Sequence, residues 1–505
     1  MGVIQRQGTK NSLVLYFGVL IGGLSTLFIY PLDYSMYGLV QTCLDLVIFL
    51  TPIVTLGATS LTLRFFPRFR QEGRDDQGFL GFILAVTLGA MIVAGGMLAL
   101  FGSYVTSSLE LLGFDLQVFR THRWPLIVLL VIYVFILIFD NYIRNYNRIV
   151  VQSLFTNLLP KVGLPVLILV LVYQGISEQT FVWGYVAIYA FALLGLVFYA
   201  KLVTPFNLRI QQSVLRQEKM LKEMYIYASY SVFGTMGAIL ATQIDSLMIT
   251  ALLDTTNTGI YKVTAFMAVV VEIPARSLRA IASPIIAKAW EEKDLDEIAH
   301  IYRRSSATLG FVGTVIFVLI AINIVDIVEW TPNPKEILAN LGVFYVLGIV
   351  RLIDLFTGSN GLIITFSSYF RFNIVAVLIL AVFNLVFNYV FLVYLEWGLL
   401  GVAMATFISL TLYNLSKFLF IQFRLGLQPF SWETIKILIV GVLGFGISFL
   451  PISTGLSLAD VAIRSLLGGG VFGLGLWYWG ICPEIKDMAI NGWNIASAWW
   501  DRYRG

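Results

Sequence analysis

The chain is a succession of long apolar runs separated by short polar segments. Most runs hold about 20 residues, the length that a helix needs to cross the hydrocarbon core of a bilayer. The runs are unbroken and do not alternate between apolar and polar residues, so they predict helices. The predicted spans are 11–30, 37–63, 79–104, 124–143, 149–173, 181–203, 226–253, 257–283, 305–327, 338–360, 373–394, 398–421, 433–450 and 460–481. The predicted fold class is an all-α polytopic membrane protein with about 14 transmembrane helices.

Composition excludes most other classes of protein. The 505 residues are 58% hydrophobic and 12% charged, whereas a soluble protein carries about 25% charged residues. The segments between spans are too short for a soluble catalytic domain, and no GxxxxGK[ST] loop is present. We therefore expect no enzyme and no direct use of ATP. Two cysteines and two histidines are too few for a disulfide framework or a metal site, and we expect no cofactor.

Basic residues concentrate in alternate segments between the spans. With the N-terminus in the cytoplasm, the external segments carry only Arg120, Arg123 and Lys335, and the other loop cations, Lys417 among them, lie on the cytoplasmic side. The positive-inside rule therefore predicts that both termini are cytoplasmic. The net charge of +4 reflects this excess at the inner face, where anionic lipids attract it, and requires no nucleic-acid partner.

Several features recur 221 residues apart, which indicates an internal duplication. Asp33 and Gly38 lie at the start of the second span, and Asp254 and Gly259 lie at the start of the eighth. Two parallel six-helix units would place a substrate between them, near the membrane midplane. The predicted domains are an N-terminal lobe at 1–203, an inter-lobe linker at 204–225, a second lobe at 226–425, two additional spans at 426–482 and a cytoplasmic interfacial tail at 483–505.

The eighth span is the richest in charge. On a continuous helix, Lys262, Glu272, Arg276 and Arg279 share one face about 100° wide. A charge at the bilayer centre costs about 2.5–3.5 kcal/mol, so this face should line a wet cavity or the interface between lobes. Alternatively, the two arginines extend to the cytoplasmic edge of the membrane or pair with Glu272.

Other ionisable residues also lie within predicted spans. Lys161 lies deep in the fifth span with no evident partner nearby in sequence, which makes it the strongest candidate for a functional residue. Asp245 lies at a depth that suits a pair with Lys262, and Arg351 and Asp354 are three residues apart. Each acid–base couple could equally be a structural ion pair that fixes two helices together.

These residues together predict a cavity lined by cations. The candidate substrate-binding cations are Lys161, Lys262, Arg276, Arg279 and Arg351, and the candidate coupling or ion-pair acids are Asp45, Asp245, Glu272 and Asp354. Such cations suit an anionic headgroup such as a diphosphate. The inside-negative membrane potential would assist the exit of such a group, and the acids could bind a coupling proton or sodium ion.

Several short motifs resemble the polysaccharide and O-antigen flippases of the multidrug/oligosaccharidyl-lipid/polysaccharide (MOP) exporter superfamily. The resemblance extends over most of residues 10–430. The motifs are Tyr37–Gln41, Gln243–Asp245, Thr258–Tyr261, Ala289–Trp290, Ile301–Arg304, Gly358–Gly361, Ser367–Arg371 and Trp397–Ala403.

The resemblance implies two pseudo-symmetric six-helix bundles plus two C-terminal helices, working by alternating access in a bacterial inner membrane. The implied cargo is a polyprenyl-diphosphate-linked oligosaccharide that is moved to the outer leaflet for surface polysaccharide synthesis. Membrane lipids and other polysaccharide assembly proteins would be its partners. Two alternatives remain: a cation-coupled multidrug exporter of the same fold, whose cationic cargo would favour an acidic cavity, and a membrane-embedded polysaccharide polymerase.

Overall fold

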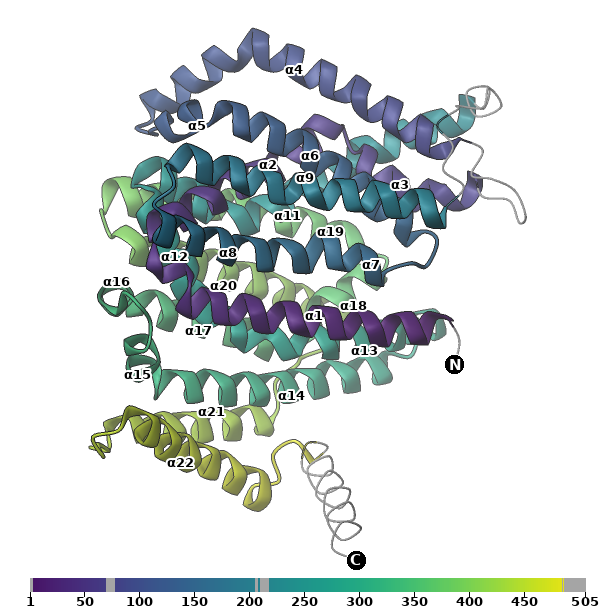
Figure 1. The fold of residues 1–505 in the computed structure, drawn as a ribbon. Coiled ribbons are helices and arrows are strands. Elements are labelled where there is room, and N and C mark those ends of the chain that lie inside the picture. The colour runs from purple at the N-terminus through teal and green to yellow at the C-terminus, as the bar shows by residue number, and fades with distance from the viewer. Residues whose placement is uncertain (1–2, 70–77, 205–207, 209–217, 484, 486–505) are drawn as a thin grey trace, which may run out of the picture. The chain divides into compact units, whose positions relative to one another are not determined.

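The computed structural model describes residues 3–69, 78–204, 208, 218–483 and 485 (Figure 1). Within these residues the regular elements are all helices. Twelve helices are long and apolar enough to cross a membrane, or thirteen if the bent pair α17 (Leu341–Phe356) and α18 (Asn360–Phe366) is one span. The chain is therefore an all-α polytopic membrane protein, as predicted.

The helices divide into two compact units. The first unit comprises Met1–Val263 and Leu392–Tyr394, and the second comprises Thr264–Phe391 and Leu395–Gly505. Helix α11 (Glu218–Leu252) belongs to the first unit because it packs against α2 (Tyr34–Thr55) and α3 (Ala58–Phe69). The predicted lobe boundaries came from the repeat and not from packing, and they remain predictions.

The other long helices of the first unit are listed here in chain order. They are α1 (Val3–Phe28), α4 (Phe79–Leu111), α6 (Arg123–Arg144), α8 (Leu159–Gln174) and α9 (Glu178–Val203), with a short π-helix, η2 (Leu154–Leu158), before α8. Helices α6 and α9 pack along each other, and α1 lies against η2 and α8. Short helices α5 (Gln117–Thr121) and α7 (Val150–Ser153) precede α6 and η2.

The second unit is built around α14 (Leu295–Ala321). This helix packs against α13 (Ile273–Glu292), α17, α21 (Trp432–Phe445) and α22 (Ser457–Tyr478). Helix α20 (Gly398–Leu425) packs against α17 and α19 (Phe370–Tyr389). Short helices α15 (Ile324–Glu329) and α16 (Pro334–Ala339) follow α14. An ion pair between Asp326 of α15 and Arg464 of α22 joins these two helices.

Two predicted spans are broken. The second span separates into α2 and α3 at Leu56 and Gly57, which both have positive φ angles of 45° and 79°. A Cβ on Gly57 would lie 2.5 Å from the carbonyl oxygen of Ala228, so this turn requires glycine. The eighth span consists of α12 (Thr255–Val269), a 3₁₀ turn at Val270–Glu272 and α13. Pro274, in the first turn of α13, lacks an N–H and favours that break.

Helices α2 and α12 cross through a reciprocal contact between the two repeats. Asp33 caps α2 by accepting a hydrogen bond from the backbone N–H of Met36. Asp254 caps α12 by accepting one from the backbone N–H of Asn257. Residues 33 and 254 are equivalent positions in the predicted repeat. A Cβ on Gly38 would lie 1.8 Å from the Thr255 carbonyl oxygen, and one on Gly259 would lie 2.0 Å from that of Tyr34. The same contact is thus made in both directions.

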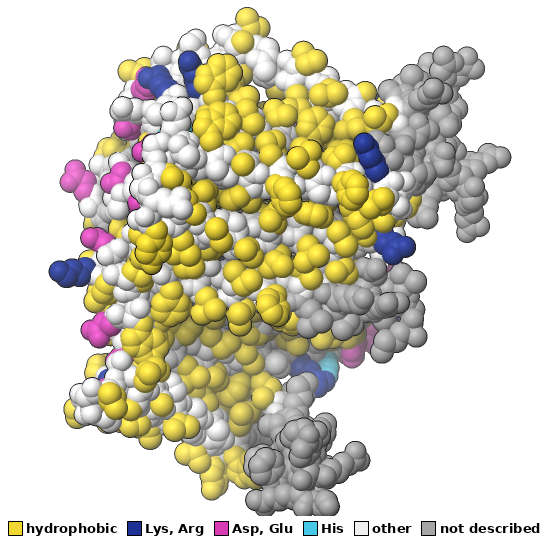
Figure 2. Space-filling view, viewed as in Figure 1, with side chains coloured by type: hydrophobic (Ala, Val, Ile, Leu, Met, Phe, Trp, Pro, Cys, Tyr) yellow, Lys and Arg dark blue, Asp and Glu magenta, His cyan; other side chains and the backbone are white. Residues whose placement is uncertain are grey.

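The outer surfaces of the long helices are apolar. Helix α4 exposes Ile92, Leu98, Leu100 and Phe101, and hydrophobic side chains cover the helix flanks in Figure 2, with charged side chains toward the helix ends. A lipid environment accounts for this pattern, since large apolar surfaces are rare on soluble monomers. Of the predicted linker, 205–207 and 209–217 lie outside the described residues, and 218–225 begin α11; the predicted tail lies almost wholly outside them.

Candidate functional site

A half-buried charge cluster lies in the second unit. It consists of Glu272, Arg279, Arg351, Asp354 and Lys417. Arg279 contacts the Asp354 carboxylate at 2.6 Å and that of Glu272 at 3.6 Å. Arg351 contacts the other oxygen of Glu272 at 3.0 Å. Two predicted cations and two predicted acids therefore meet in one network, as ion pairs.

The helix break after α12 positions this cluster. Glu272 ends the 3₁₀ turn, and Arg279 lies on α13 just beyond it. Arg351 and Asp354, three residues apart on α17, present their side chains to the same face of that helix. The pairing of Arg351 with Glu272 and of Arg279 with Asp354 fastens α17 to the region of the break.

Lys417 is the member of the cluster that sequence reasoning missed. We predicted it at the cytoplasmic edge, but it is only 4% exposed and lies within α20. Its ammonium nitrogen is 3.9 Å from the ring centroid of Tyr413 and experiences the charges of Asp354 and Arg279. No ion pair of Lys417 is found within the described part of the chain. Helix α20 continues beyond Lys417 to Leu425. A helix that extends past the lysine is the signal from which its position inside α20 could have been predicted.

Arg276 does not join the cluster. Its side chain is exposed, and it forms no ion pair within the described residues. The shared face of Lys262, Glu272, Arg276 and Arg279 therefore stays a prediction, although its premise of a straight, continuous helix does not hold. It assumed a continuous helix, whereas the 3₁₀ turn at Val270–Glu272 changes the angular register between Lys262 and the residues of α13.

A second polar site lies in the first unit around Asp45. The Asp45 carboxylate, 3% exposed, contacts the Lys262 ammonium group at 2.6 Å. It also accepts a hydrogen bond from Ser246, and with the Gln243 side-chain amide flipped to suit its neighbours, the amide nitrogen donates to the other oxygen at 2.9 Å. A buried carboxylate with this set of partners is well satisfied. The site connects α2, α11 and α12.

The predicted partner of Lys262 was Asp245, and the structure pairs the lysine with Asp45 instead. Asp245 accepts a hydrogen bond of 2.9 Å from the Tyr261 hydroxyl. A chain of hydroxyl groups, Thr42 to Thr250 at 2.6 Å and Thr250 to Thr258 at 2.7 Å, continues the polar contact between the same three helices. The predicted pair of Asp245 with Lys262 considered only α11 and α12, which are consecutive in sequence. Helix α2 packs against both α11 and the start of α12, and it supplies the acid instead.

Lys161 lies on α8, next to α1. Gly18 and Gly22, one helical turn apart on α1, leave room for its methylene chain: an added Cβ at either position would be 3.6 Å from Lys161 Cδ. The side chain is half-buried. Lys161 is therefore part of the α1–α8 contact, and its role in substrate binding remains a prediction.

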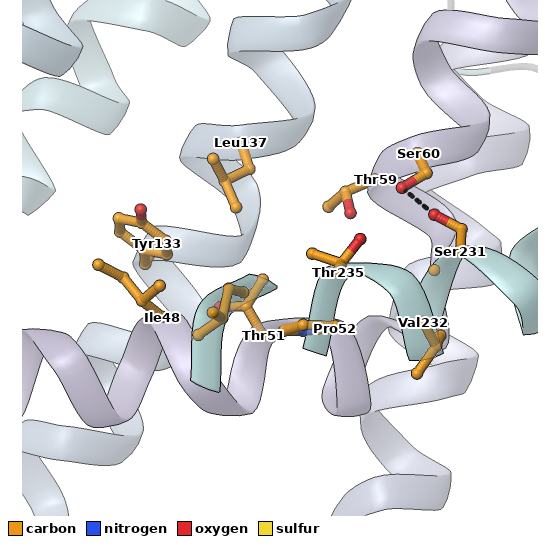
Figure 3. Close-up of a pocket in the computed structure, with 12 residues that line it drawn as sticks. Ile48, Thr51, Pro52, Thr59, Ser60, Tyr133, Leu137, Ser231, Val232 and Thr235 are labelled. Atoms are coloured by element: carbon orange, nitrogen blue, oxygen red, sulfur yellow. Dashed lines mark hydrogen bonds between the residues drawn. The ribbon is translucent and has the colours of Figure 1, made fainter. Parts of the chain in front are cut away.

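Two cavities open in the first unit. One, of about 160 Å³, is lined by both hydroxyl and apolar side chains of α2, α3 and α11 together with Tyr133 and Leu137 of α6 (Figure 3). The other, of about 180 Å³, is lined by α6, η2 and α9 and also includes Tyr133 and Leu137. The cavities adjoin the same stretch of α6. Within the described residues no group of three metal-binding side chains occurs.

Comparisons with known proteins identify the fold. No family model matches the sequence, and no curated protein matches it. An inward-facing multidrug resistance MATE family transporter of the MOP superfamily is similar in structure, with a TM-score of 0.62 and 14% identity over 81% of this chain and 94% of that one. Lipid II flippase MurJ in an inward closed conformation gives a TM-score of 0.66 and 13% identity over 93% and 98%.

A MATE structure in complex with MaL6 gives a TM-score of 0.54 and 14% identity over 84% and 96%. These similarities extend over nearly the full length of the known structures. Likeness at this level of identity concerns the arrangement of helices and not the cargo. The chain has the fold of the MOP exporter superfamily.

Proposed function

We propose that the protein is a flippase that moves a polyprenyl-diphosphate-linked oligosaccharide from the inner to the outer leaflet of a bacterial inner membrane. The charge cluster of the second unit carries this proposal. Three of its members are cationic and two are acidic, so the cluster has a positive excess of one charge. Lys417 supplies that excess from a buried position.

The donors of the cluster suit a diphosphate. Arg351 Nε, in the cluster, and Asn414 Nδ2, three residues before Lys417 on α20, are buried and have no hydrogen-bond partner within the described residues. A buried donor without a partner is unfavourable by about 1–3 kcal/mol, so a ligand that accepts from it gains that free energy. Phosphate oxygens accept from guanidinium, ammonium and amide groups alike. The ion pairs Arg279–Asp354 and Arg351–Glu272 would occupy these cations in the absence of ligand.

Transport itself would proceed by alternating access. The inside-negative membrane potential favours the exit of an anionic headgroup by about 2.3 kcal/mol per charge per 100 mV. Asp45 with Lys262 is a second acid–base couple inside the membrane, and a proton or sodium gradient could act there. Membrane lipids and other polysaccharide assembly proteins are the proposed partners.

A deletion strain tests the proposed function. Lipids are extracted from cells lacking the gene, and polyprenyl-diphosphate-linked oligosaccharides are measured together with surface polysaccharide. We expect the lipid-linked units to accumulate and the surface polymer to be lost. Unchanged levels of both would contradict the flippase.

A cation-coupled multidrug exporter is the second candidate. The favouring observation is the buried carboxylate of Asp45, since an acid next to an exchangeable cation could couple to a gradient. This candidate predicts increased sensitivity of the deletion strain to cationic drugs with unchanged lipid-linked oligosaccharides. The positive excess of the second-unit cluster disfavours it, because a cationic cargo would be repelled there.

A further inference from the structure

Helices α2, α11 and α12 hold two polar layers about one helical turn apart, all within the first unit. Each helix contributes one residue to each layer, because its two residues are three or four positions apart and therefore share a helix face. The hydroxyl layer is formed by Thr42, Thr250 and Thr258. The charged layer is formed by Asp45, Ser246 and Lys262.

The charged layer holds one anion and one cation in contact. The Lys262 ammonium nitrogen lies 2.6 Å from Asp45 Oδ2, and the Ser246 hydroxyl donates to the same oxygen. The Asp45 side chain is 3% exposed and that of Lys262 is 22% exposed. A carboxylate buried to this degree requires a cation beside it, since an uncompensated charge in the interior is strongly destabilising.

The oxygen atoms of the two layers are of the kind that bind alkali-metal ions. Hard metal cations prefer oxygen ligands, and the layers offer one carboxylate and the hydroxyl oxygens of one serine and three threonines. A single carboxylate balances a single positive charge. The site therefore suits a monovalent ion such as sodium better than a divalent one.

Lys262 already supplies that positive charge. Its ammonium group and the Asp45 carboxylate together make the charged layer neutral. A sodium ion beside the same carboxylate would give the layer a net positive charge in a low-dielectric interior, and the ammonium group would repel it. A free ion must also compete with a cation that is attached to the chain, and whose effective concentration at the site is therefore high.

We propose that the Asp45 site is a monovalent-cation site in which the tethered ammonium group of Lys262 takes the place of a sodium ion. The inference goes beyond the proposed function and is independent of which cargo is carried. Of the two ions that could act at this couple, sodium is then removed in the wild-type protein. Truncation of the lysine side chain leaves the carboxylate with its oxygen neighbours and creates a sodium site.

Thermal unfolding of the purified full-length protein in detergent tests the site. Each protein is measured in sodium chloride and in choline chloride at equal ionic strength, because choline is too large to replace an ammonium group. We expect equal midpoints for the wild type. For Lys262→Ala, a tenfold excess of sodium over its dissociation constant should raise the midpoint by about 2 °C. Methylammonium chloride should also stabilise this variant, because it restores the missing ammonium group.

Two further variants are matched controls. The double variant Asp45→Asn, Lys262→Ala lacks the carboxylate that would bind the ion. Lys436→Ala removes a lysine whose ammonium group donates to a backbone carbonyl, that of Trp479, and not to a carboxylate. Neither control should respond to sodium.

Three results would overturn the proposal. The first is an equal midpoint of Lys262→Ala in sodium and in choline, and the second is a sodium response that the double variant retains. The third is a sodium response of the wild type that Asp45→Asn abolishes, because sodium would then bind beside the lysine. Lys262→Ser, which adds a hydroxyl of its own, is measured in parallel and decides the outcome if Lys262→Ala does not fold.

Discussion

Lys417 illustrates how a single buried charge is accommodated. Its ammonium group lies over the Tyr413 ring, a contact worth up to about 2 kcal/mol when water is excluded. Burial disfavours its charged form, and of the two neighbouring charges Asp354 is favourable and Arg279 is unfavourable. A cation held in this way is a strong attractor for an incoming anion, because its own ion-pairing capacity is not fully used.

Replacing Lys417 by Met should therefore impair transport without loss of the protein. A lost charge-assisted bond of about 1.5–3 kcal/mol corresponds to about a 10- to 100-fold weaker interaction with the headgroup. Surface polysaccharide and accumulated lipid-linked units are measured at equal membrane abundance. Lys288→Met, which removes an exposed lysine paired with Glu292, should transport normally. Normal transport by Lys417→Met would contradict the role of the cluster.

Asp45 and Lys262 should depend on each other for stability. Lys262→Met leaves a carboxylate that is 3% exposed without its cation, which destabilises a protein by about 3–5 kcal/mol. The double variant Asp45→Leu, Lys262→Met removes both charges and should recover much of that loss. Thermal unfolding in detergent measures the two variants. Equal midpoints for the single and double variants would show that the ion pair is not coupled.

The partners of these charges could not be found from sequence alone. Glu272, Arg279, Arg351 and Asp354 could be singled out from the sequence, because a charge inside an apolar run is conspicuous. Which acid meets which cation depends on packing between distant helices. Asp45 therefore pairs with Lys262, and the nearer acid in sequence, Asp245, accepts from Tyr261.

At the scale of helices, the apolar runs predicted where elements occur but not where they break. Spans of the predicted length exist because the membrane requires them. The break at Leu56–Gly57 exists because α11 approaches the backbone there, and the one at Val270–Glu272 accompanies Pro274. Residues 284–304, between the predicted eighth and ninth spans, are helical in α13 and α14 except for a short turn.

Gly38 should be intolerant of even a methyl group. An added Cβ would lie 1.8 Å from the Thr255 carbonyl oxygen, so Gly38→Ala must push α2 and α12 apart. We expect a lower unfolding midpoint in detergent and reduced abundance in the membrane. Gly95→Ala on α4, where an added Cβ meets nothing within 4 Å, should be neutral or slightly stabilising. An unchanged midpoint for Gly38→Ala would show that the contact is not tight.

At the scale of the molecule, the distribution of charge decides the orientation. Exposed apolar helix flanks and charged helix ends fit a multi-pass membrane protein (Figure 2). The bias of basic residues toward alternate loops further predicts which ends are cytoplasmic. Fold class was predictable because composition and run length act on the whole chain. The cargo was not, since it depends on a few side chains in sites that only folding assembles.

Cysteine labelling tests the predicted orientation. Cys43 and Cys482 are buried, so an introduced cysteine should dominate the reaction with a membrane-impermeant maleimide. Gln117→Cys, between α4 and α6, should react in intact spheroplasts. Glu291→Cys, near the end of α13, should react only after the membrane is opened. The reverse pattern would invert the topology.

The reciprocal contact of Gly38 and Gly259 also bears on ancestry. Gly38 faces the Thr255 carbonyl, and Gly259 faces the Tyr34 carbonyl. Residues 34 and 255 are equivalent in the predicted repeat, as are residues 38 and 259. Two identical subunits related by a two-fold axis meet in this way, with one patch contacting itself. A single-copy ancestor of half this length could have made the same contact as a homodimer. Gene fusion would then have joined two subunits that already fitted each other.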